Sequence, residues 1–331
     1  MAEGRVKWID WCRGIGIFIV IFIHVGLGLQ LSGRFVEYDY FLFVIMRICV
    51  NMIMPLFFII SGLLYFDKSK TTTELSKSIL NKAIQLGIPY LLFSVFNWSI
   101  KFLLGTDVKG HLGWNDLLLI PVRPFDYLWF LYVLLLAFVI SELLDYYFKN
   151  NVVVFGIFLT MAIISWHYWT EMFIVNRAME MIIYFYIGKM LRLHIQMLKS
   201  RSFFVLIILS YLLLQFVDIR LENVYRGMVF VVAVSASFSV LSIGMRLNEN
   251  NRFFKYFCKI GLITMPIFLV HAPIVTATRI CLFKAGIDNF ILHFIIGISV
   301  AWFLSILIAK IAGRYKYLDM LFYPGKYLVS K

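Results

Sequence analysis

The chain has 331 residues, of which 62% are hydrophobic and only 15% are charged, and its formal net charge is +13 at pH 7. Soluble domains average about half apolar and a quarter charged residues, so this composition excludes a soluble domain and indicates a polytopic membrane protein. The basic residues are scattered between apolar runs, so no nucleic-acid partner is expected, and the four cysteines form neither a disulfide framework nor a metal-binding pattern.

Ten apolar segments are long enough to span or nearly span a bilayer, and the connections between them are short except for one longer loop at 105–126. The sequence therefore predicts an all-α fold, a polytopic membrane helix bundle of about ten transmembrane helices in one domain over residues 1–331. In chain order the predicted segments are roughly 12–31, 41–66, 78–104, 127–147, 151–166, 177–195, 203–219, 225–246, 259–281 and 289–313.

The positions of lysine and arginine predict the orientation of the chain in the membrane. If the N-terminus is cytoplasmic, more than twice as many of the 31 basic residues fall on the inner side as on the outer side. This bias follows the positive-inside rule. We therefore expect a multi-pass protein of the cell (inner, cytoplasmic) membrane, in direct contact with the lipid bilayer, with both termini in the cytoplasm.

The first segment carries Asp10 and Arg13 at its start and His24 deep inside it. Arg13 and His24 are eleven residues apart, which places them about 20° apart around a helix and about 16 Å apart along it. An ionisable residue near the bilayer midplane is a functional candidate, although a histidine hydrogen-bonded within the bundle is the alternative. Likewise, Asp10 can hold Arg13 in place to bind a phosphate or carboxylate, or form a structural ion pair with it.

The ninth segment carries a second buried histidine, His271. Counted from Lys259, it lies about 18 Å into the membrane, almost the depth of His24, so the two could meet. Pro266 and Pro273 weaken this estimate because they can kink or break the helix. The same prolines also suit a polar-lined cavity at membrane depth. Such a histidine suits general-base catalysis and a transporter's proton relay equally well.

Two further ionisable residues, Arg47 and Glu180, fall in the second and sixth segments, nearer the outer surface. They could bind an acceptor substrate, or pair with each other or with Asn51 and Asn176 for structural reasons. Lys77 and Lys82 belong to a cytoplasmic lysine group that also includes Lys68 and Lys70. This group could attract a coenzyme with several phosphates, and anionic lipid or positive-inside bias explains it as well.

Six motifs occur in order along almost the whole chain. They are Arg13 with His24 as R-x10-H, MPLFFIISG at Met54 to Gly62, IPY at Ile88 to Tyr90, LWFLYVLL at Leu128 to Leu135, FYIGKML at Phe185 to Leu191, and IGLITMPIFLVHAPI at Ile260 to Ile274. Together they resemble the membrane acyltransferase-3 family. The likeness is greatest to its surface-polysaccharide O-acetyltransferases, the branch related to fucose 4-O-acetylase.

The resemblance implies transfer of an acyl group, usually acetyl, from cytoplasmic acyl-coenzyme A (acetyl-CoA) to a sugar hydroxyl of a surface or lipid-linked glycan, with no metal. It implies that His24 acts as general base or acyl-relay residue and that Arg13, steadied by Asp10, positions the thioester or phosphates. His271 and Trp129 would shape the site. The family's basic R-x-x-R pair before IPY falls here on Lys82 and Gln85, so one charge is lost, and nearby Lys77 could substitute.

Two other classes of function stay open. A proton-coupled transporter or flippase of a glycan or lipid-linked sugar would use the same histidines, and its sequence cue, an inverted repeat, is not evident. A structural membrane subunit has no need of a midplane histidine in each of two helices. A homo-oligomer is compatible with either function.

Overall fold

The computed structural model describes residues 6–66, 71–104, 113–221 and 225–329, and all regular structure in these ranges is helical. Within them, eight helices are long and apolar enough to cross a membrane, and α7 (Asn151–His167) is a shorter apolar helix. This confirms the predicted all-α polytopic membrane bundle. The predicted segment 177–195 corresponds to α8 (Phe173–Leu193), which is set apart by its charged residues Arg177, Glu180, Lys189 and Arg192.

Contacts between residues divide the chain into two compact units. Unit 1 comprises Met1–Ile60 and Leu191–Lys310, and unit 2 comprises Ser61–Met190 and Ile311–Lys331. Each boundary falls inside a helix, namely α2 (Asp39–Leu63), α8 and α13 (Phe290–Ala312). The predicted histidine site therefore has to be built within unit 1, which contains both histidines.

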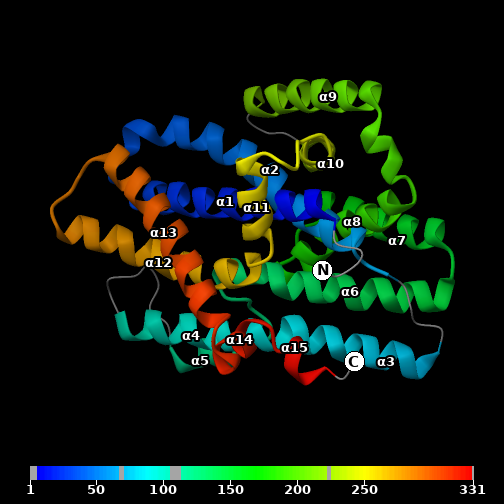
Figure 1. The fold of residues 1–331 in the computed structure, drawn as a ribbon, viewed down its shortest axis with the longest axis horizontal. Coiled ribbons are helices and arrows are strands. Elements are labelled where there is room, and N and C mark those ends of the chain that lie inside the picture. The colour runs from blue at the N-terminus through cyan, green and yellow to red at the C-terminus, as the bar shows by residue number, and fades with distance from the viewer. Residues whose placement is uncertain (1–5, 67–70, 105–112, 222–224, 330–331) are drawn as a thin grey trace. The chain divides into compact units, whose positions relative to one another are not determined.

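Unit 1 is organised around α1 (Lys7–Gln30), which packs against α10 (Arg226–Gly244), α11 (Arg252–Gly261) and α12 (Thr264–Lys284) (Figure 1). The contact between α1 and α11 is backbone to backbone. A Cβ on Gly14 would overlap the carbonyl of Phe257, and one on Gly261 would overlap the backbone of Asp10. Because no side chain separates the two helices here, α11 fixes the first turns of α1, where Asp10 and Arg13 lie.

The ninth predicted segment differs from the observed helices. Residues 259–261 belong to α11, the chain turns at Leu262 and Ile263, and α12 begins at Thr264. Pro266 is the third residue of α12, where the missing N–H breaks no intrahelical hydrogen bond, and the helix continues through Pro273. His271 is consequently only about 10 Å from the start of its helix instead of the predicted 18 Å.

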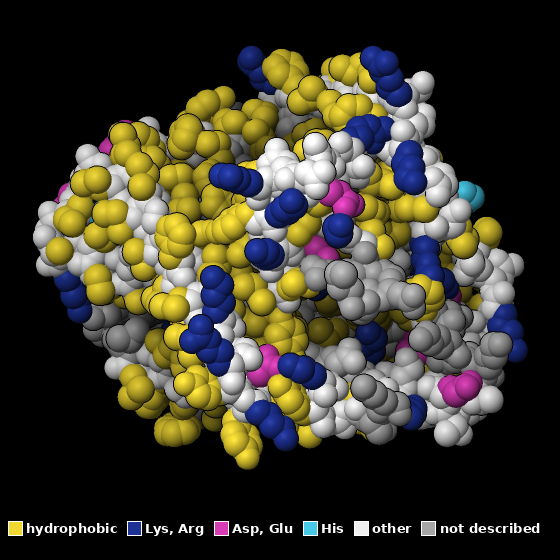
Figure 2. Space-filling model, in the orientation of Figure 1, with side chains coloured by type: hydrophobic (Ala, Val, Ile, Leu, Met, Phe, Trp, Pro, Cys, Tyr) yellow, Lys and Arg dark blue, Asp and Glu magenta, His cyan; other side chains and the backbone are white. Residues whose placement is uncertain are grey.

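In the same unit, α9 (Arg201–Arg220) packs on α10, and none of its apolar side chains is buried. Its buried residues are Gln215 and Asp218. Hydrophobic side chains make up much of the visible surface of the protein (Figure 2), as a membrane protein requires. The remaining short elements of this unit are η1 (Val36–Tyr38) and η5 (Ile195–Lys199).

The first complete helix of unit 2 is α3 (Thr72–Lys82), which starts earlier than the predicted segment 78–104. A capping box explains the start, because the Thr71 side chain accepts from the Glu74 backbone N–H while the Glu74 carboxylate accepts from that of Thr71. A π-helical turn, η2 (Ala83–Gly87), then joins α3 to α4 (Ile88–Leu104). Such turns are frequent at functional sites. The rest of the unit contains α5 (Trp114–Leu118), η4 (Asp126–Leu128), α6 (Trp129–Phe148), α7, α8, α14 (Lys316–Phe322) and α15 (Gly325–Leu328).

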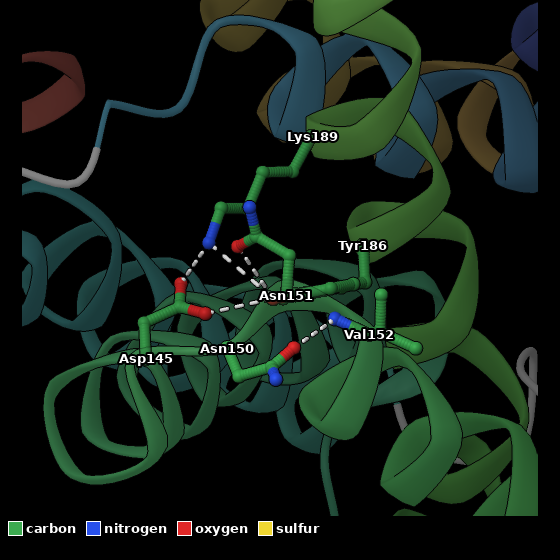
Figure 3. Close-up of polar contacts among 6 residues, drawn as sticks. All are labelled: Asp145, Asn150, Asn151, Val152, Tyr186 and Lys189. Atoms are coloured by element: carbon green, nitrogen blue, oxygen red, sulfur yellow. Dashed lines mark hydrogen bonds and ion pairs between the residues drawn. The ribbon is translucent and has the colours of Figure 1, made fainter.

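A buried polar cluster holds α6, α7 and α8 together (Figure 3). The Asp145 carboxylate accepts from Lys189 Nζ at 2.5 Å and from the Tyr186 hydroxyl at 2.8 Å, and Tyr186 also lies 3.2 Å from Asn151 Oδ1. At the start of α7, the Asn150 side chain caps the helix by accepting from the Val152 backbone N–H. Three helices thus share one set of hydrogen bonds, which fixes their register.

Candidate active site

The structure brings His24 of α1 and His271 of α12 into contact. Their ring centroids lie 4.7 Å apart, and the ring planes meet at 83°. His271 is fully buried, whereas His24 is half-buried. Of the two imidazoles, His24 is therefore the more accessible. We call these two residues the histidine pair.

Backbone carbonyl groups orient both rings of the histidine pair. Nδ1 of His24 lies 2.9 Å from the carbonyl oxygen of Val20, and Nδ1 of His271 lies 2.7 Å from that of Phe268. A carbonyl oxygen only accepts a hydrogen bond, so each Nδ1 carries the hydrogen and, in a neutral ring, Nε2 is the basic nitrogen. Each ring is thereby held by its own helix in the tautomer that leaves Nε2 as the proton acceptor.

A second contact joins the same two helices beyond the histidines. The Arg279 guanidinium of α12 donates to the carbonyl oxygen of Gly28, near the end of α1. The two helices therefore run in the same direction, with His24 beside His271 and then Gly28 beside Arg279. A charge-assisted bond of this kind fixes the spacing of α1 and α12 close to the rings.

Asp10 and Arg13 both lie in the first part of α1, where α11 packs. Asp10 is buried in the first turn, where the helix dipole favours a negative charge, and Arg13 is half-buried three residues later. The continuity of α1 keeps Arg13 and His24 about 16 Å apart along one face. At this spacing the two side chains could contact the two ends of an extended ligand, but they could not both contact one reacting group.

Lys82 and Gln85, at the positions of the family's basic pair, lie in unit 2 at the π-helical turn. Lys82 is half-buried, and its Nζ lies 4.2 Å from the centroid of the Phe138 ring in α6. Gln85 lies against the backbone of Gly325 in α15. Lys77 is exposed on α3, whereas Lys68 and Lys70 lie outside the described residues.

The short helix α15 is in turn anchored by the buried Asp319 of α14. Its carboxylate accepts from Lys326 Nζ and from the Tyr327 hydroxyl, each at 2.7 Å. The hydrogen bond with Asp319, and then that with Tyr327, raise the pKa of Lys326 above its ordinary value. The positive charge of Lys326 thus lies next in sequence to Gly325, the residue that contacts Gln85.

Arg47 and Glu180 each have an ion-pair partner that the sequence analysis did not name. The carboxylate of Asp218 in α9 accepts from Arg47 Nε at 2.7 Å and Nη2 at 3.1 Å, from Asn51 at 2.9 Å and from Gln215 at 3.3 Å. We call these four residues the Asp218 cluster. Of the two alternatives for Arg47, these contacts favour structural pairing.

Glu180 accepts from Arg177 Nη1 at 2.9 Å, one turn earlier in α8. Trp129, at the start of α6, is half-buried and lies 5.4 Å from the guanidinium carbon of the same Arg177. The structure therefore brings together two predicted site residues, Trp129 and Glu180, through an arginine that the sequence analysis missed.

Four charged residues that matter in the structure were not singled out from the sequence: Glu142, Asp145, Arg177 and Asp218. Three of them are buried carboxylates, with Glu142 at 2%, Asp145 at 5% and Asp218 at 0% exposure. Each lies within a predicted apolar segment, so an isolated carboxylate in an apolar run was the available signal. No group of three His, Cys, Asp or Glu side chains that could hold a metal ion occurs in the described part of the chain.

A family model described as an acyltransferase domain matches residues 6–310, nearly the whole chain. The chain belongs to the acyltransferase-3 family. No curated protein and no solved structure matches it. The family and the apolar helices together make this protein a membrane acyltransferase.

The structure gives one acyltransferase-3 motif a packing role. At the end of the MPLFFIISG motif, a Cβ on Gly62 would overlap the carbonyl of Phe185 in α8. The end of α2 and α8 therefore touch directly within unit 2. Two other motifs form the histidine pair: the R-x10-H motif supplies His24, and the motif of the ninth segment supplies His271.

Proposed function

We propose that this membrane acyltransferase is an O-acetyltransferase that moves an acetyl group from acetyl-CoA at the cytoplasmic side to a sugar hydroxyl of a surface or lipid-linked glycan. The observation that supports it most is the contact between His24 and His271, two imidazoles whose rings are held with Nε2 as the basic nitrogen. Acyl transfer to a hydroxyl needs a base of this kind, because the hydroxyl must lose its proton as it attacks.

In this reaction His24 acts as general base. Its Nε2 takes the proton of the sugar hydroxyl while the hydroxyl oxygen attacks the thioester carbonyl. The carbon–sulfur bond then breaks, and the coenzyme A thiolate takes the proton back from His24, so the products are the sugar ester and the free thiol. Positioned proton transfer of this kind contributes about 10²–10⁴-fold to a rate.

His271 is a positioning residue in this scheme. Being fully buried against His24, it holds the orientation of the neighbouring ring and excludes water from one side of it. Arg13, with Asp10 beside it in the first turns of α1, binds the thioester end or a phosphate of the donor through its forked guanidinium. Lys82 and Lys77 of unit 2 serve the phosphates of the coenzyme, and Trp129 and Glu180 serve the sugar.

The test is an acetyl-transfer assay with the purified protein in lipid nanodiscs. Radiolabelled acetyl-CoA is supplied with glycans extracted from cells that lack the gene, and the products are analysed by mass spectrometry. We expect label in the glycan and a mass gain of one acetyl group, with both absent when acetyl-CoA is omitted. Movement of the glycan across a membrane under a pH gradient, with no acetyl transfer, would instead establish a transporter.

A further inference from the structure

An arginine enclosed by aromatic rings lies at one end of unit 2. The guanidinium carbon of Arg177 is 5.4 Å from the ring centroid of Trp129, 5.8 Å from that of Trp169 and 5.4 Å from that of Phe173. On its remaining side, Glu180 accepts from Nη1 at 2.9 Å. We call these five residues the Arg177 cage. They come from the start of α6, the α7–α8 connection and the first turns of α8.

The Arg177 cage is open to its surroundings. Trp169 is 45% exposed and Phe173 is 41% exposed, and the Arg177 side chain is one-third exposed. Within the described residues, Nη2 of Arg177 makes no hydrogen bond, so it can donate to a ligand. Aromatic faces, an arginine donor and a carboxylate acceptor are therefore presented together.

The connection that carries Trp169 is fixed in place by a buried amide. Asn176 is fully buried; its Oδ1 accepts from the backbone N–H of Thr170 at 3.0 Å and from the Thr170 hydroxyl at 2.9 Å, while its Nδ2 donates to the Thr170 carbonyl at 2.6 Å. Trp169, the residue before Thr170, is thereby held beside Arg177. A fixed backbone of this kind lowers the ordering cost of binding, as a preorganised binding site requires.

The charges of the cage select the class of ligand. Because Glu180 already neutralises Arg177, an anionic group such as a lipid phosphate or a uronate gains little attraction and meets a carboxylate. A neutral sugar can use both the aromatic rings and the hydrogen-bonding groups of the cage. Its C–H faces stack on the exposed rings, and its vicinal hydroxyls donate to Glu180 and accept from Arg177 Nη2.

We propose that the Arg177 cage is the subsite that recognises a neutral sugar residue of the acceptor glycan. The inference rests on the proposed function and names the part of the acceptor that this chain reads. The positive-inside pattern predicts that the α7–α8 connection and the start of α6 face away from the cytoplasm, where a surface glycan is available.

The test uses the whole protein in nanodiscs, methyl glycosides of neutral hexoses and deoxyhexoses, and methyl glucuronide as the anionic counterpart. Trp169→Ala is the main variant because its side chain is exposed, and Tyr168→Ala is the matched control because the adjacent Tyr168 is 73% exposed and outside the cage. Initial acetyl-transfer rates give KM and kcat for each acceptor, and saturation-transfer NMR reports glycoside binding without turnover.

We expect Trp169→Ala to raise KM for the neutral glycosides about tenfold or more, to leave kcat and KM for acetyl-CoA within about twofold, and to weaken the NMR signal. Arg177→Lys keeps the charge but not the fork and should act in the same direction. Equal KM values and equal NMR signals in Trp169→Ala and Tyr168→Ala, or tighter binding of the glucuronide, would overturn the inference. If the wild-type protein transfers no acetyl group but its NMR signal still depends on Trp169, the proposed reaction fails and the subsite stands.

Discussion

Unit 1 contains two buried polar centres that differ in how their hydrogen bonds are arranged. In the Asp218 cluster, one carboxylate accepts hydrogen bonds from three side chains, and the charge of Arg47 balances its own. In the histidine pair, each ring is bonded through Nδ1 to its own helix, which orients Nε2 as a base. The Asp218 carboxylate is thus held as a paired charge, whereas the histidine rings are held in a form that can accept a proton. This difference separates a structural centre from a candidate catalytic one.

The two centres also hold different helices. The Asp218 cluster joins α2 to α9, a helix whose buried residues are Gln215 and Asp218, so it is the main polar attachment of that helix. The histidine pair joins α1 and α12, which also have extensive apolar packing and the Arg279 contact. Loss of the first should therefore affect stability, and loss of the second should affect catalysis.

The largest effect is expected for His24→Gln. The amide cannot take a proton at neutral pH, so acetyl transfer per folded molecule should fall about 10²–10⁴-fold. Initial rates with labelled acetyl-CoA measure it, and size-exclusion chromatography gives the folded fraction. The matched control is His293→Gln in α13, because His293 is also buried, at 1% exposure, but lies outside the pair. Equal rate losses in both variants would contradict the assignment of His24 as the general base.

The next effect is expected for Asp218→Ala, which leaves the half-buried Arg47 without its counter-charge. Breaking a buried pair on one side costs about 3–5 kcal/mol, so the midpoint of thermal unfolding in detergent should fall clearly. In the double variant Arg47→Met with Asp218→Leu, no lone charge remains and most of the stability should return. A double variant as unstable as Asp218→Ala would show that the cluster does more than pair its charges.

A smaller effect is expected for Arg279→Met, which removes the charged donor to the Gly28 carbonyl but keeps an apolar stem of similar reach. The lost charge-assisted hydrogen bond should lower the free energy of unfolding by about 1.5–3 kcal/mol. Because this contact lies close to the histidine pair on the same two helices, kcat should also fall, by less than in His24→Gln. An unchanged kcat would indicate that the spacing of α1 and α12 does not depend on Arg279.

The smallest effect is expected for Tyr186→Phe in unit 2, where Asp145 keeps Lys189 as its partner. The loss of one hydrogen bond to a carboxylate should lower the free energy of unfolding by about 1–2 kcal/mol and leave turnover unchanged. Chemical denaturation and the acetyl-transfer assay measure the two quantities. A fall in turnover at full folding would mean that this cluster is not simply structural.

The sequence predicted the histidine pair better than the Asp218 cluster, for a physical reason. Depth along a helix follows from residue count, so His24 and His271 could be placed near each other, although the break between α11 and α12 changed the count for His271. That break contains no proline and was missed. The turn at Leu262 and Ile263 is set by the packing of α11 on α1, which spacing within one segment does not reveal.

Partners on separate helices were not predictable from a single sequence. Arg47 and Asp218 are 171 residues apart, and nothing in the local pattern says that α2 and α9 meet. Glu180 is a different case: it was considered as a partner of Arg47, whereas it bonds to Arg177 three residues earlier in its own helix, a spacing that the sequence does show. Helix existence followed from hydropathy because hydropathy is local, and side-chain pairing did not because it depends on tertiary packing.

The most direct measurement compares His24→Gln with the double variant Arg47→Met, Asp218→Leu in one acetyl-transfer assay, with both proteins purified in nanodiscs and normalised to folded protein. The predicted result is a loss of about 100-fold or more in the first variant and a rate within about threefold of wild type in the second. Comparable losses in both, or a His24→Gln protein that transfers acetyl groups at the wild-type rate, would contradict the assignment of the histidine pair as the catalytic centre.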